Sequence, residues 1–577
     1  MALSYFKFKI YYFPFLLKFI PKSYNCFLWI FILFSGLPPF TITYAQWQPN
    51  GVAICDTIAN AGVNTLPQIA TDMNGGAFIC WKDGRSGADT DIYMQYIFSD
   101  GTMQFPHNGV PLCNESGPQQ FLRMISDKKG GAFVSWEDGR SGTNIEIYAQ
   151  HINEQGKKLW DNQGKKVTEK PGLFINLASD DRGGLIVGYV CGGIHDVVVQ
   201  YIDSLGSIAW GDSGVQVTNR PDVIYPGDVA VVSDGSGGAF VGWSERTGTT
   251  FDYTVFIQRV DSSGQIVFAT NGIALTNNTL QNVDVNLSSD NDGGVLISWA
   301  SLVSGGSTDT SWKYVQRVSS IGDFLWGPTG VRIGTVIGGG ARRHTSDGEG
   351  GAYIGHGRWI QHISVDGELS WPSEGAPFTL QPSLFFNSTQ ARNGSKGIWN
   401  FWSQDAGGLT SVDVYGQYID SSGNVKWETD GKPMCLVEHI QDYSKATSDD
   451  KGTAIVVWMD WRNSRTNVYA SKVNAEGIIT KVEDHGGMLP LEPYLEQNYP
   501  NPFNPVTKIK YTIPEGTFVR LTVFDILGNE IALLVNEKKP AGSNDIEFDG
   551  IGLPSGIYFY QLRAGSFVET KKMILLR

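Results

Sequence analysis

A short motif that recurs along most of the chain constrains the fold more than any other feature of the sequence. In its clearest copy, residues 126–136, a polar turn ending in two glycines separates two strand-forming segments, a pattern typical of a hairpin. The equivalent glycine returns about every 54 residues, and such a period predicts stacked repeats rather than one irregular domain. These glycines are Gly76, Gly131, Gly184, Gly238, Gly294, Gly351, Gly397 and Gly452.

Each repeat divides into four short segments that predict strands. In the second repeat they cover residues 121–126, 131–136, 145–152 and 164–167, with turn residues between them. Four antiparallel strands per repeat, with glycine and aromatic residues at fixed offsets, are typical of propeller blades. The expected fold class is therefore all-β: a single closed β-propeller of about eight four-stranded blades over residues 46–483, with seven blades as the alternative count.

The two ends of the repeat region complement each other. Residues 478–481 of the last repeat contain no aromatic residue and predict no closing strand, although the other repeats have a Trp or Phe at this point. Residues 47–52, with the sequence WQPNGV, match residues 210–215, WGDSGV, in residue type. We expect an N-terminal strand to complete the last blade, because this arrangement leaves no open sheet edge.

Two polar features recur within the repeats. A glutamine in the third strand of seven repeats, such as Gln150, is expected to hydrogen-bond to neighbouring backbone, with ligand binding as the alternative. The strand order places the longer polar loops on one face, where binding residues are commonly found. Charged pairs recur there; loop-stabilising contacts are the favoured interpretation and ligand binding is the alternative. These candidate binding residues are Asp83, Arg85, Asp138, Arg140, Glu245, Arg246, Asp460 and Arg462.

The sequence argues against several function classes. A net charge of −14 repels phosphate backbones, so no nucleic-acid partner is expected. There is no CxxC pair, HExxH helix, GxSxG elbow or P-loop, so no metal, cofactor or catalytic residue is assigned. The sixth repeat is the most divergent: residues 355–358 replace the long loop, and Arg342, Arg343 and His344 lie upstream. Either a ligand-binding notch or degeneration of one repeat explains this divergence.

The repeat turn also resembles the Asp-box of propellers such as sialidases, which runs Ser-x-Asp-x-Gly-x-x-Trp. Here the aspartate, Asp127, directly follows Ser126. The resemblance implies an alternative function, that of a secreted polysaccharide-acting hydrolase with its site in the central channel. A non-catalytic binding, recognition or scaffold module for a glycan or protein ligand is the favoured interpretation, and we expect a monomer.

The N-terminus predicts an export signal. Four lysines precede an apolar segment at residues 26–34, and small residues at 43 and 45 fit a signal-peptidase site. A signal peptide over residues 1–45 is therefore expected, and a retained membrane anchor is the alternative. Because prolines and lysines interrupt the apolar stretch below the roughly 20 residues that span a bilayer, we expect the mature protein not to span a membrane.

The C-terminal region differs in composition. Residues 484–496 are expected to form a linker, and short alternating segments after residue 497 predict a small Ig-like β-sandwich. The motifs NYPNPFNP, VFDILG, LPSGIY and the terminal KKMILLR occur in order, and together they resemble the C-terminal sorting domain of the type IX secretion system. The residues that carry the resemblance are Asn498, Pro500, Asn501, Pro502, Phe503, Asn504, Pro505, Gly528, Gly556, Tyr558, Lys571 and Lys572.

This resemblance implies that residues 497–577 are an address. It implies two-step export, first through the general pathway and then through the type IX secretion machinery as a partner. The protein would end at the outer cell surface or be secreted, and the sequence leaves open whether the mature form is attached or released. The address says nothing about the chemistry of the repeat region.

Overall fold

The computed structural model describes residues 47–56, 66–478 and 494–576, except for short gaps. The expected signal peptide and most of the expected linker lie outside the described residues. The gaps are 49, 88, 193–195, 221–222, 248–251, 278–279, 304–310, 336–342, 373, 382–384, 406–411, 463–464, 496–497, 499–500, 514–515, 540–541 and 566.

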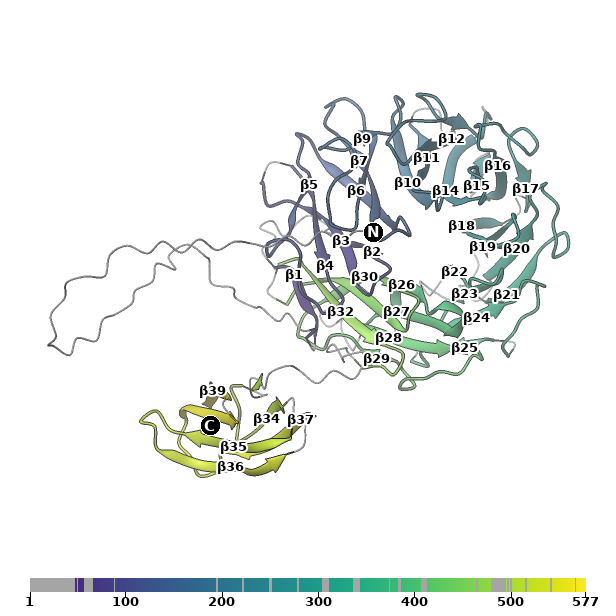
Figure 1. The fold of residues 1–577 in the computed structure, drawn as a ribbon. Coiled ribbons are helices and arrows are strands. Elements are labelled where there is room, and N and C mark those ends of the chain that lie inside the picture. The colour runs from purple at the N-terminus through teal and green to yellow at the C-terminus, as the bar shows by residue number, and fades with distance from the viewer. Residues whose placement is uncertain are drawn as a thin grey trace, which may run out of the picture. The chain divides into compact units, whose positions relative to one another are not determined.

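Within the described residues, the repeat region forms eight four-stranded antiparallel sheets, here numbered I to VIII (Figure 1). Sheet I contains β2 (Gln68–Thr71), β3 (Ala77–Asp83), β4 (Asp91–Ile97) and β5 (Val110–Cys113). Sheet II contains β6 (Gln119–Ser126), β7 (Ala132–Asp138), β8 (Glu146–Ile152) and β9 (Lys165–Lys166). Sheet III contains β10 (Gly172–Ser179), β11 (Leu185–Cys191), β12 (Val197–Ile202) and β13 (Val215–Gln216). Sheet IV contains β14 (Val223–Ser233), β15 (Ala239–Thr247), β16 (Thr254–Val260) and β17 (Ile273–Ala274).

The other four sheets follow the same order. Sheet V contains β18 (Gln281–Ser289), β19 (Val295–Leu302), β20 (Trp312–Val318) and β21 (Val331–Thr335). Sheet VI contains β22 (His344–Ser346), β23 (Ala352–His356), β24 (Trp359–Ile363) and β25 (Ala376–Pro377). Sheet VII contains β26 (Phe385–Arg392), β27 (Gly397–Asp405), β28 (Val412–Asp420) and β29 (Lys432–Pro433). Sheet VIII contains β30 (Gln441–Ser448), β31 (Thr453–Asp460), β32 (Asn467–Asn474) and β1 (Val52–Cys55).

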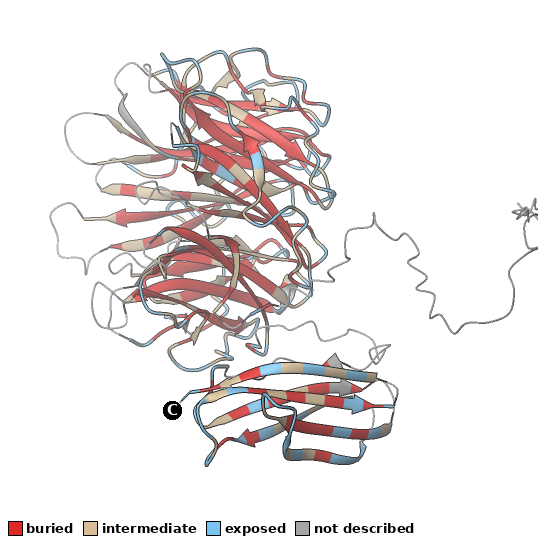
Figure 2. Cartoon of the chain, turned by 90° about the vertical axis from the view of Figure 1, so that its left-hand side faces the viewer, coloured by how far each residue is buried: buried red, intermediate tan, exposed pale blue. Residues whose placement is uncertain are grey.

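The first strand of each sheet is the innermost. These strands contact one another in sequence order from β2 to β30, and β30 also contacts β2. Figure 1 shows them around a common centre. Eight clusters of buried apolar side chains lie between neighbouring sheets, and one of them joins sheet VIII to sheet I. Figure 2 shows this burial along the strands, so the apolar core lies between the sheets.

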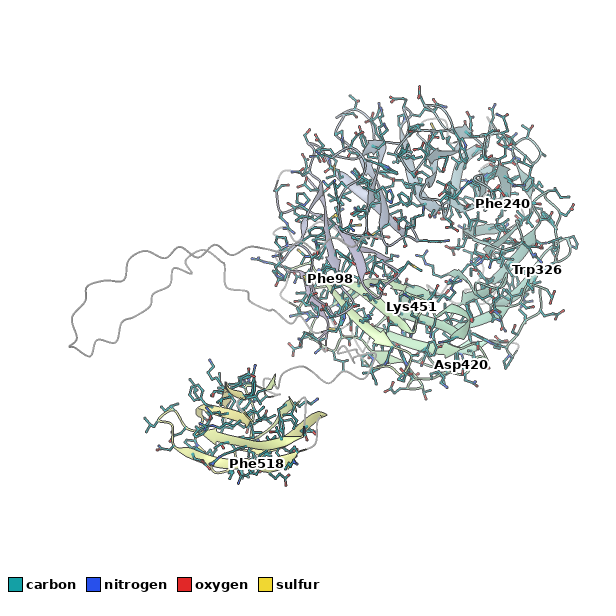
Figure 3. The ribbon with its side chains drawn as sticks, in the orientation of Figure 1. Phe98, Phe240, Trp326, Asp420, Lys451 and Phe518 are labelled. Carbon is teal, nitrogen blue, oxygen red and sulfur yellow. The ribbon has the colours of Figure 1, made fainter. Side chains whose placement is uncertain are left out.

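The N-terminal strand completes sheet VIII, as the sequence predicts. In the register of β1 and β32, Val52 lies opposite Ala470. The Trp47 indole lies in the core between sheets VIII and I and donates a 3.0 Å hydrogen bond to the carbonyl of Ser99 in the next sheet. The same contact recurs elsewhere; Trp326, labelled in Figure 3, donates to the carbonyl of Val365 at 3.3 Å. Trp47 therefore occupies the place of a repeat tryptophan.

The turn acid explains the periodic glycines. In sheet II, Asp127 Oδ1 accepts the backbone N–H groups of Lys129 and Gly131, both at 2.7 Å. Its Oδ2 lies 2.9 Å from His151 Nε2 in the third strand. A Cβ at Gly131 would lie 2.2 Å from the carbonyl oxygen of Ile152, so a larger residue does not fit without a shift of backbone. The turn is thus fixed by one carboxylate and one glycine.

The recurring glutamine makes backbone contacts, as expected. Gln150 Oε1 accepts the N–H groups of His151 and Trp160, and its Nε2 donates to the carbonyl of Asp161 at 2.6 Å. This buried side chain holds the third strand to the segment that leads into the fourth strand.

Most innermost strands contain a β-bulge. The register shifts once in β6, β10, β18, β26 and β30, and the backbone has a positive φ at the bulge. The residues with positive φ are Phe121 (48°), Phe174 (58°), Asp284 (56°), Asn387 (53°) and Tyr443 (54°). Bulges re-aim side chains, and here they change which residues of the innermost strands face outward from the core.

The C-terminal domain contains two sheets that share one apolar core. The first sheet contains β33 (Tyr494–Leu495), β34 (Val506–Ile513) and β37 (Gly542–Asp549). The second contains β35 (Thr517–Phe524), β36 (Glu530–Lys539), β38 (Gly556–Ala564) and β39 (Phe567–Leu575). The short segments after residue 497 form strands, as the sequence predicts, and β33 precedes them and pairs with β34.

Among the described residues there is no α-helix, and so none with the length and hydropathy that crossing a membrane requires.

Candidate functional site

The charged residues predicted on the loop face form a repeated structural unit, which we call the loop clasp. In sheet II, the buried Asp138 accepts the Trp136 indole N–H at 2.7 Å and the Arg140 backbone N–H at 2.9 Å. Arg140 also donates through Nε and Nη2 to Asp138, and through Nη2 to the carbonyl of Gln163 at 2.9 Å. Its guanidinium lies 3.8 Å from the ring centre of Tyr148.

Sheets I and VIII repeat the loop clasp. Arg85 pairs with Asp83 at 2.6 Å and lies over Tyr93. Arg462 pairs with Asp460 at 2.6 Å and lies over Tyr469. In sheet VIII the arginine also donates to the carbonyl of Asn50, so the N-terminal segment takes part in the clasp of the last repeat.

Sheet IV has a variant of the loop clasp in which a second arginine takes part. Glu245 accepts the Trp243 indole N–H at 2.9 Å, as the other clasp acids do. Arg220 pairs with Glu245 and also lies over Phe256. Arg220 comes from the connection before the sheet, so adjacency in sequence could not identify it.

The clasp arginines are largely occupied by internal contacts. The side chains of Arg85, Arg140 and Arg462 are 23%, 18% and 15% exposed, and their acids are fully buried. Burial opposes the charged form of each arginine, but the hydrogen bond and charge of the paired aspartate outweigh it and raise the pKa. The observed contacts fit the loop-stabilising interpretation, and ligand binding by these residues stays a prediction.

A second set of residues lies on the innermost strands or directly before them. Each of these residues precedes the turn residue equivalent to Asp127 by four positions, and we call this place the inner position. Unlike the clasp, this position varies from sheet to sheet. It holds Gln68, Arg123, Asn176, Ala230, Asn286, Arg343, Thr389 and Lys445 in sheets I to VIII.

Three inner positions carry cations that interact with one another. Arg123 and Arg343 are exposed and Lys445 is half-buried. Burial and the charges of Arg343 and Arg123 lower the pKa of Lys445 to about 7. The surrounding protein and Arg343 lower the pKa of Arg123, although its side chain stays accessible to water, whereas Glu137 raises it. The charge of Lys445 is therefore disfavoured by both arginines, and that of Arg123 by Arg343.

These cations lack carboxylate partners close enough for an ion pair. Within the described parts of the chain, none of Arg123, Arg343 and Lys445 forms a salt bridge. The guanidinium of Arg123 donates to the carbonyl of Leu122 at 3.2 Å. This contrasts with the paired arginines of the loop clasp.

Exposed aromatic residues lie two positions before the inner position. Phe121, Phe174 and Tyr443 are 55%, 48% and 38% exposed, and each is the positive-φ residue of a bulge. Large exposed aromatic side chains are unusual on a strand that contributes to a core. Two of them, Phe121 and Tyr443, lie on the same strands as Arg123 and Lys445.

Carboxylates also occur on or beside the innermost strands. Asp228 Oδ2 accepts the N–H of Asp284 at 2.6 Å, and burial and the charge of Asp284 raise the pKa of Asp228. Glu137 accepts the N–H of Phe174 at 3.0 Å, and burial raises the pKa of this carboxyl to about 7. Both carboxylates hold a bulge in the neighbouring sheet.

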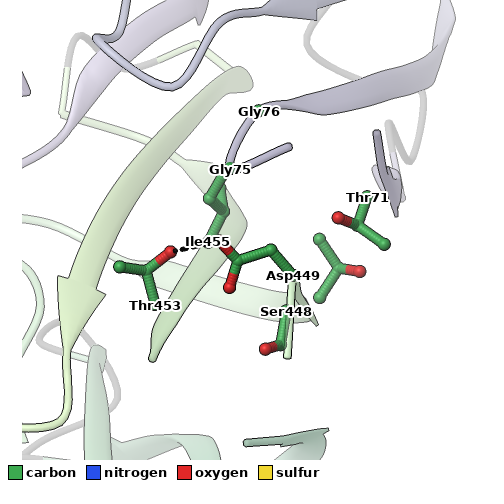
Figure 4. Close-up of a pocket in the computed structure, with 8 residues that line it drawn as sticks. Thr71, Gly75, Gly76, Ser448, Asp449, Thr453 and Ile455 are labelled. Carbon is green, nitrogen blue, oxygen red and sulfur yellow. Dashed lines mark hydrogen bonds between the residues drawn. The ribbon is translucent and has the colours of Figure 1, made fainter. Parts of the chain in front are cut away.

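Two depressions lie elsewhere. One, between sheets VIII and I, is lined by Thr71 and Asp449 among others, and has no room for a water molecule (Figure 4). The other, beside Phe324 between sheets IV and V, has a volume of about 460 Å³. The divergent residues of the sixth repeat have different surroundings: Arg343 is exposed, whereas His344 contacts Ser288 Oγ at 2.7 Å and burial lowers its pKa to about 3. Arg342 lies outside the described residues.

The predicted sorting residues are mostly structural parts of the C-terminal sandwich. The N–H of Asn498 donates to Tyr560 Oη, and Asn501 Oδ1 accepts the N–H of Ile574. Phe503 is buried and exchanges two backbone hydrogen bonds with β39. The peptide bond before Pro502 is cis, Asn504 is exposed, and the carbonyl of Pro505 accepts the N–H of Gly550. Gly528 lies in a turn. The remaining residues lie in strands: Gly556 and Tyr558 in β38, and Lys571 and Lys572 in β39. Pro500 lies outside the described residues.

Comparison with known proteins identifies the C-terminal part of the chain. Residues 497–576 match the family model described as "Secretion system C-terminal sorting domain". This segment is therefore a sorting domain of the type IX secretion system, as the sequence motifs indicate. It marks the chain for export to the cell surface or the medium and implies interaction with the type IX secretion machinery. A search of curated proteins gave no significant match.

Solved structures show only distant likeness. A protein of unknown function from Dyadobacter fermentans is 11% identical, with 73% of this chain and 97% of that chain covered and a TM-score of 0.33. The Hadza microbial sialidase Hz136 is 8% identical, with 66% and 73% covered and a TM-score of 0.34. PorZ, a surface component of the type IX secretion system of Porphyromonas gingivalis, is 10% identical, with 92% and 85% covered and a TM-score of 0.22. Similarity at this level establishes no shared function.

Proposed function

We propose that the eight sheets are the blades of one closed propeller, and that this propeller is a non-catalytic recognition module delivered to the cell surface or the medium. Closure is supported by the pairing of β1 with β32 and by the apolar cluster between sheets VIII and I. Delivery is supported by the sorting domain at residues 497–576. The expected partner is a glycan or a protein, and the expected state is a monomer.

One observation carries the recognition role: departures from the repeat gather on the innermost strands. A structural position is expected to hold similar residues in nearly every sheet, as the turn acid and the glutamine do in seven of the eight. The inner position instead holds three unpaired cations, with exposed aromatic side chains nearby. Residues that cost stability and fill no structural need are typical of binding sites. The loop clasp residues would then support the face around this site.

The alternative, a polysaccharide hydrolase, rests on the carboxylates beside the innermost strands. The raised pKa of Glu137 would suit a general acid. However, Glu137 and Asp228 each accept a backbone N–H from the next sheet, which gives them a structural role. We therefore favour binding.

Binding of the purified chain to a glycan array, with released sugars assayed in parallel, tests the two functions. Binding without release supports the recognition module. Release of sugars that Glu137→Gln abolishes would establish the hydrolase instead. Delivery is tested separately by deleting residues 498–577: the shortened protein should remain inside the cell with its propeller folded, and its normal appearance at the surface would contradict the role of the sorting domain.

A further inference from the structure

We infer that the centre of the eight sheets binds an anionic polysaccharide, one that carries carboxylate or sulfate groups. This inference rests on the proposed recognition function and names its ligand class. It starts from three cations, Arg123, Arg343 and Lys445, that three different innermost strands or their leading segments bring to the same register position.

The arrangement is electrostatically unfavourable without a ligand. Arg343 and Arg123 both disfavour the charged form of Lys445, and Arg343 disfavours that of Arg123. The protein as a whole carries a net charge of −14, so ample carboxylates exist, yet none forms a salt bridge with these three within the described residues. A bound anion would supply the missing negative charge and relieve the mutual repulsion.

The aromatic residues indicate that the anion is carried by a sugar polymer. Phe121 and Arg123 are both exposed while Leu122 between them is buried, so the ring and the cation lie on the same side of β6. On β30, Tyr443 and Lys445 show the same alternation around the buried Ser444. An exposed aromatic ring offers an apolar face to the C–H groups of a sugar ring, and the neighbouring cation can pair with its charged substituent.

The spacing of the sites favours a polymer over a single small anion. Such aromatic–cation pairs occur in sheets II and VIII, with Phe174 in sheet III and Arg343 in sheet VI completing the set. Contacts distributed over four sheets suit several sugar units that each contribute a modest share of the affinity.

Dextran polymers provide a matched test, because one backbone is available neutral, carboxymethylated or sulfated. We expect the purified chain without its signal peptide to bind carboxymethyl-dextran or dextran sulfate at least tenfold more tightly than dextran. The preferred derivative distinguishes a carboxylate from a sulfate ligand. Arg123→Gln and Lys445→Gln should each weaken this binding about three- to tenfold, and the two together with Arg343→Gln should abolish it.

Matched controls separate the site from general charge effects. Lys426→Gln removes an exposed cation from the outer part of sheet VII and should leave binding unchanged. Phe121→Ala should weaken binding of the dextran derivatives but not of polyglutamate, which has carboxylates and no sugar. Circular dichroism confirms that each variant is folded; Arg123→Gln, at an exposed position, remains informative if Lys445→Gln does not fold.

The outcomes distinguish this inference from the proposed function. Equal binding of all three dextrans, or unchanged binding by the triple variant, overturns the anionic site. If the glycan array shows binding to neutral glycans alone, the recognition module stands and the anionic site fails. If neither the array nor a charged polymer binds, both fail.

Discussion

The arginines of the loop clasp and the cations of the inner position differ in their surroundings. Arg140 of the clasp has a buried carboxylate, a carbonyl acceptor and an aromatic ring as neighbours. Lys445 at the inner position faces two other cations and has no ion-pair partner among the described residues. We therefore expect the first arrangement to stabilise the fold and the second to destabilise it.

This difference helps to distinguish structural positions from functional positions in a repeat protein. The clasp recurs in sheets I, II, IV and VIII because each of these sheets has a buried Trp indole that needs an acceptor at the start of a long loop. The inner position varies because the innermost strands are held mainly by strand pairing and core packing, although Asn176 Oδ1 accepts the N–H of Val231 in the neighbouring sheet. Repeated residues therefore indicate the structural frame, by which we mean the strands, turns and loop clasps that stabilise the eight sheets. Residues that depart from the repeat on the innermost strands indicate the region available for function.

The largest loss of stability is expected at the junction of sheets VIII and I, where the N-terminal segment packs. Trp47→Ala removes a fully buried indole from the core between sheets VIII and I, and should lower the free energy of unfolding by about 3–5 kcal/mol. Deletion of residues 47–54 should destabilise the eight-sheet region further. Thermal unfolding measures both, and Gln48→Ala, at an exposed neighbour, serves as the control. An unchanged melting transition would contradict closure through β1.

The loop clasp should give a smaller loss of stability. Asp138→Ala leaves the buried Trp136 indole and the Arg140 guanidinium without their main acceptor, and should cost about 2–3 kcal/mol. The control is Glu169→Ala in the connection that follows the same sheet, where the acid of the Lys166–Glu169 pair is 66% exposed and the expected change is below about 0.5 kcal/mol. Equal effects in denaturant titrations would show that the clasp contributes no more than a surface ion pair.

Much of the repeated structure was predictable from the sequence, whereas the binding site proposed at the inner position largely was not. Gly131 and Asp127 recur because backbone geometry demands them, so the repeat length, strand order and role of the N-terminal segment followed from spacing alone. The bulge at Phe121 and the partnership of Arg220 with Glu245 depend on three-dimensional neighbours that no local pattern encodes. The three cations could still have been found from the sequence, because Arg123, Arg343 and Lys445 each precede a turn acid by four residues.

The pH dependence of anion binding should be intermediate in size. Because the pKa of Lys445 is lowered to about 7, this side chain loses its charge as the pH rises through 7. Glu137 beside Arg123, with its pKa raised to about 7, gains negative charge over the same range and acts in the same direction. Affinity for carboxymethyl-dextran should therefore fall about tenfold between pH 6 and pH 8.

Two variants assign this pH dependence to its groups. Lys445→Gln should reduce the dependence, and its combination with Glu137→Gln should remove it. A fall in affinity that persists unchanged in the double variant would show that other groups titrate, and isothermal titration calorimetry at three pH values decides between these results.

The smallest expected effect is a gain in stability, whereas the clasp variants lose stability. This opposite sign tests the comparison of the two sites most directly. Lys445→Gln removes a cation from beside two others, so the unliganded protein should become more stable, by up to about 1 kcal/mol after screening by solvent. The native pKa is below the ordinary value of 10.5, so the charged lysine destabilises the fold most at pH values below 7. The gain should therefore be largest below pH 7 and shrink as the pH rises toward 10.5. Denaturant titrations at pH 6 and pH 9 measure this difference, and a loss of stability at pH 6 would mean that Lys445 belongs to the frame.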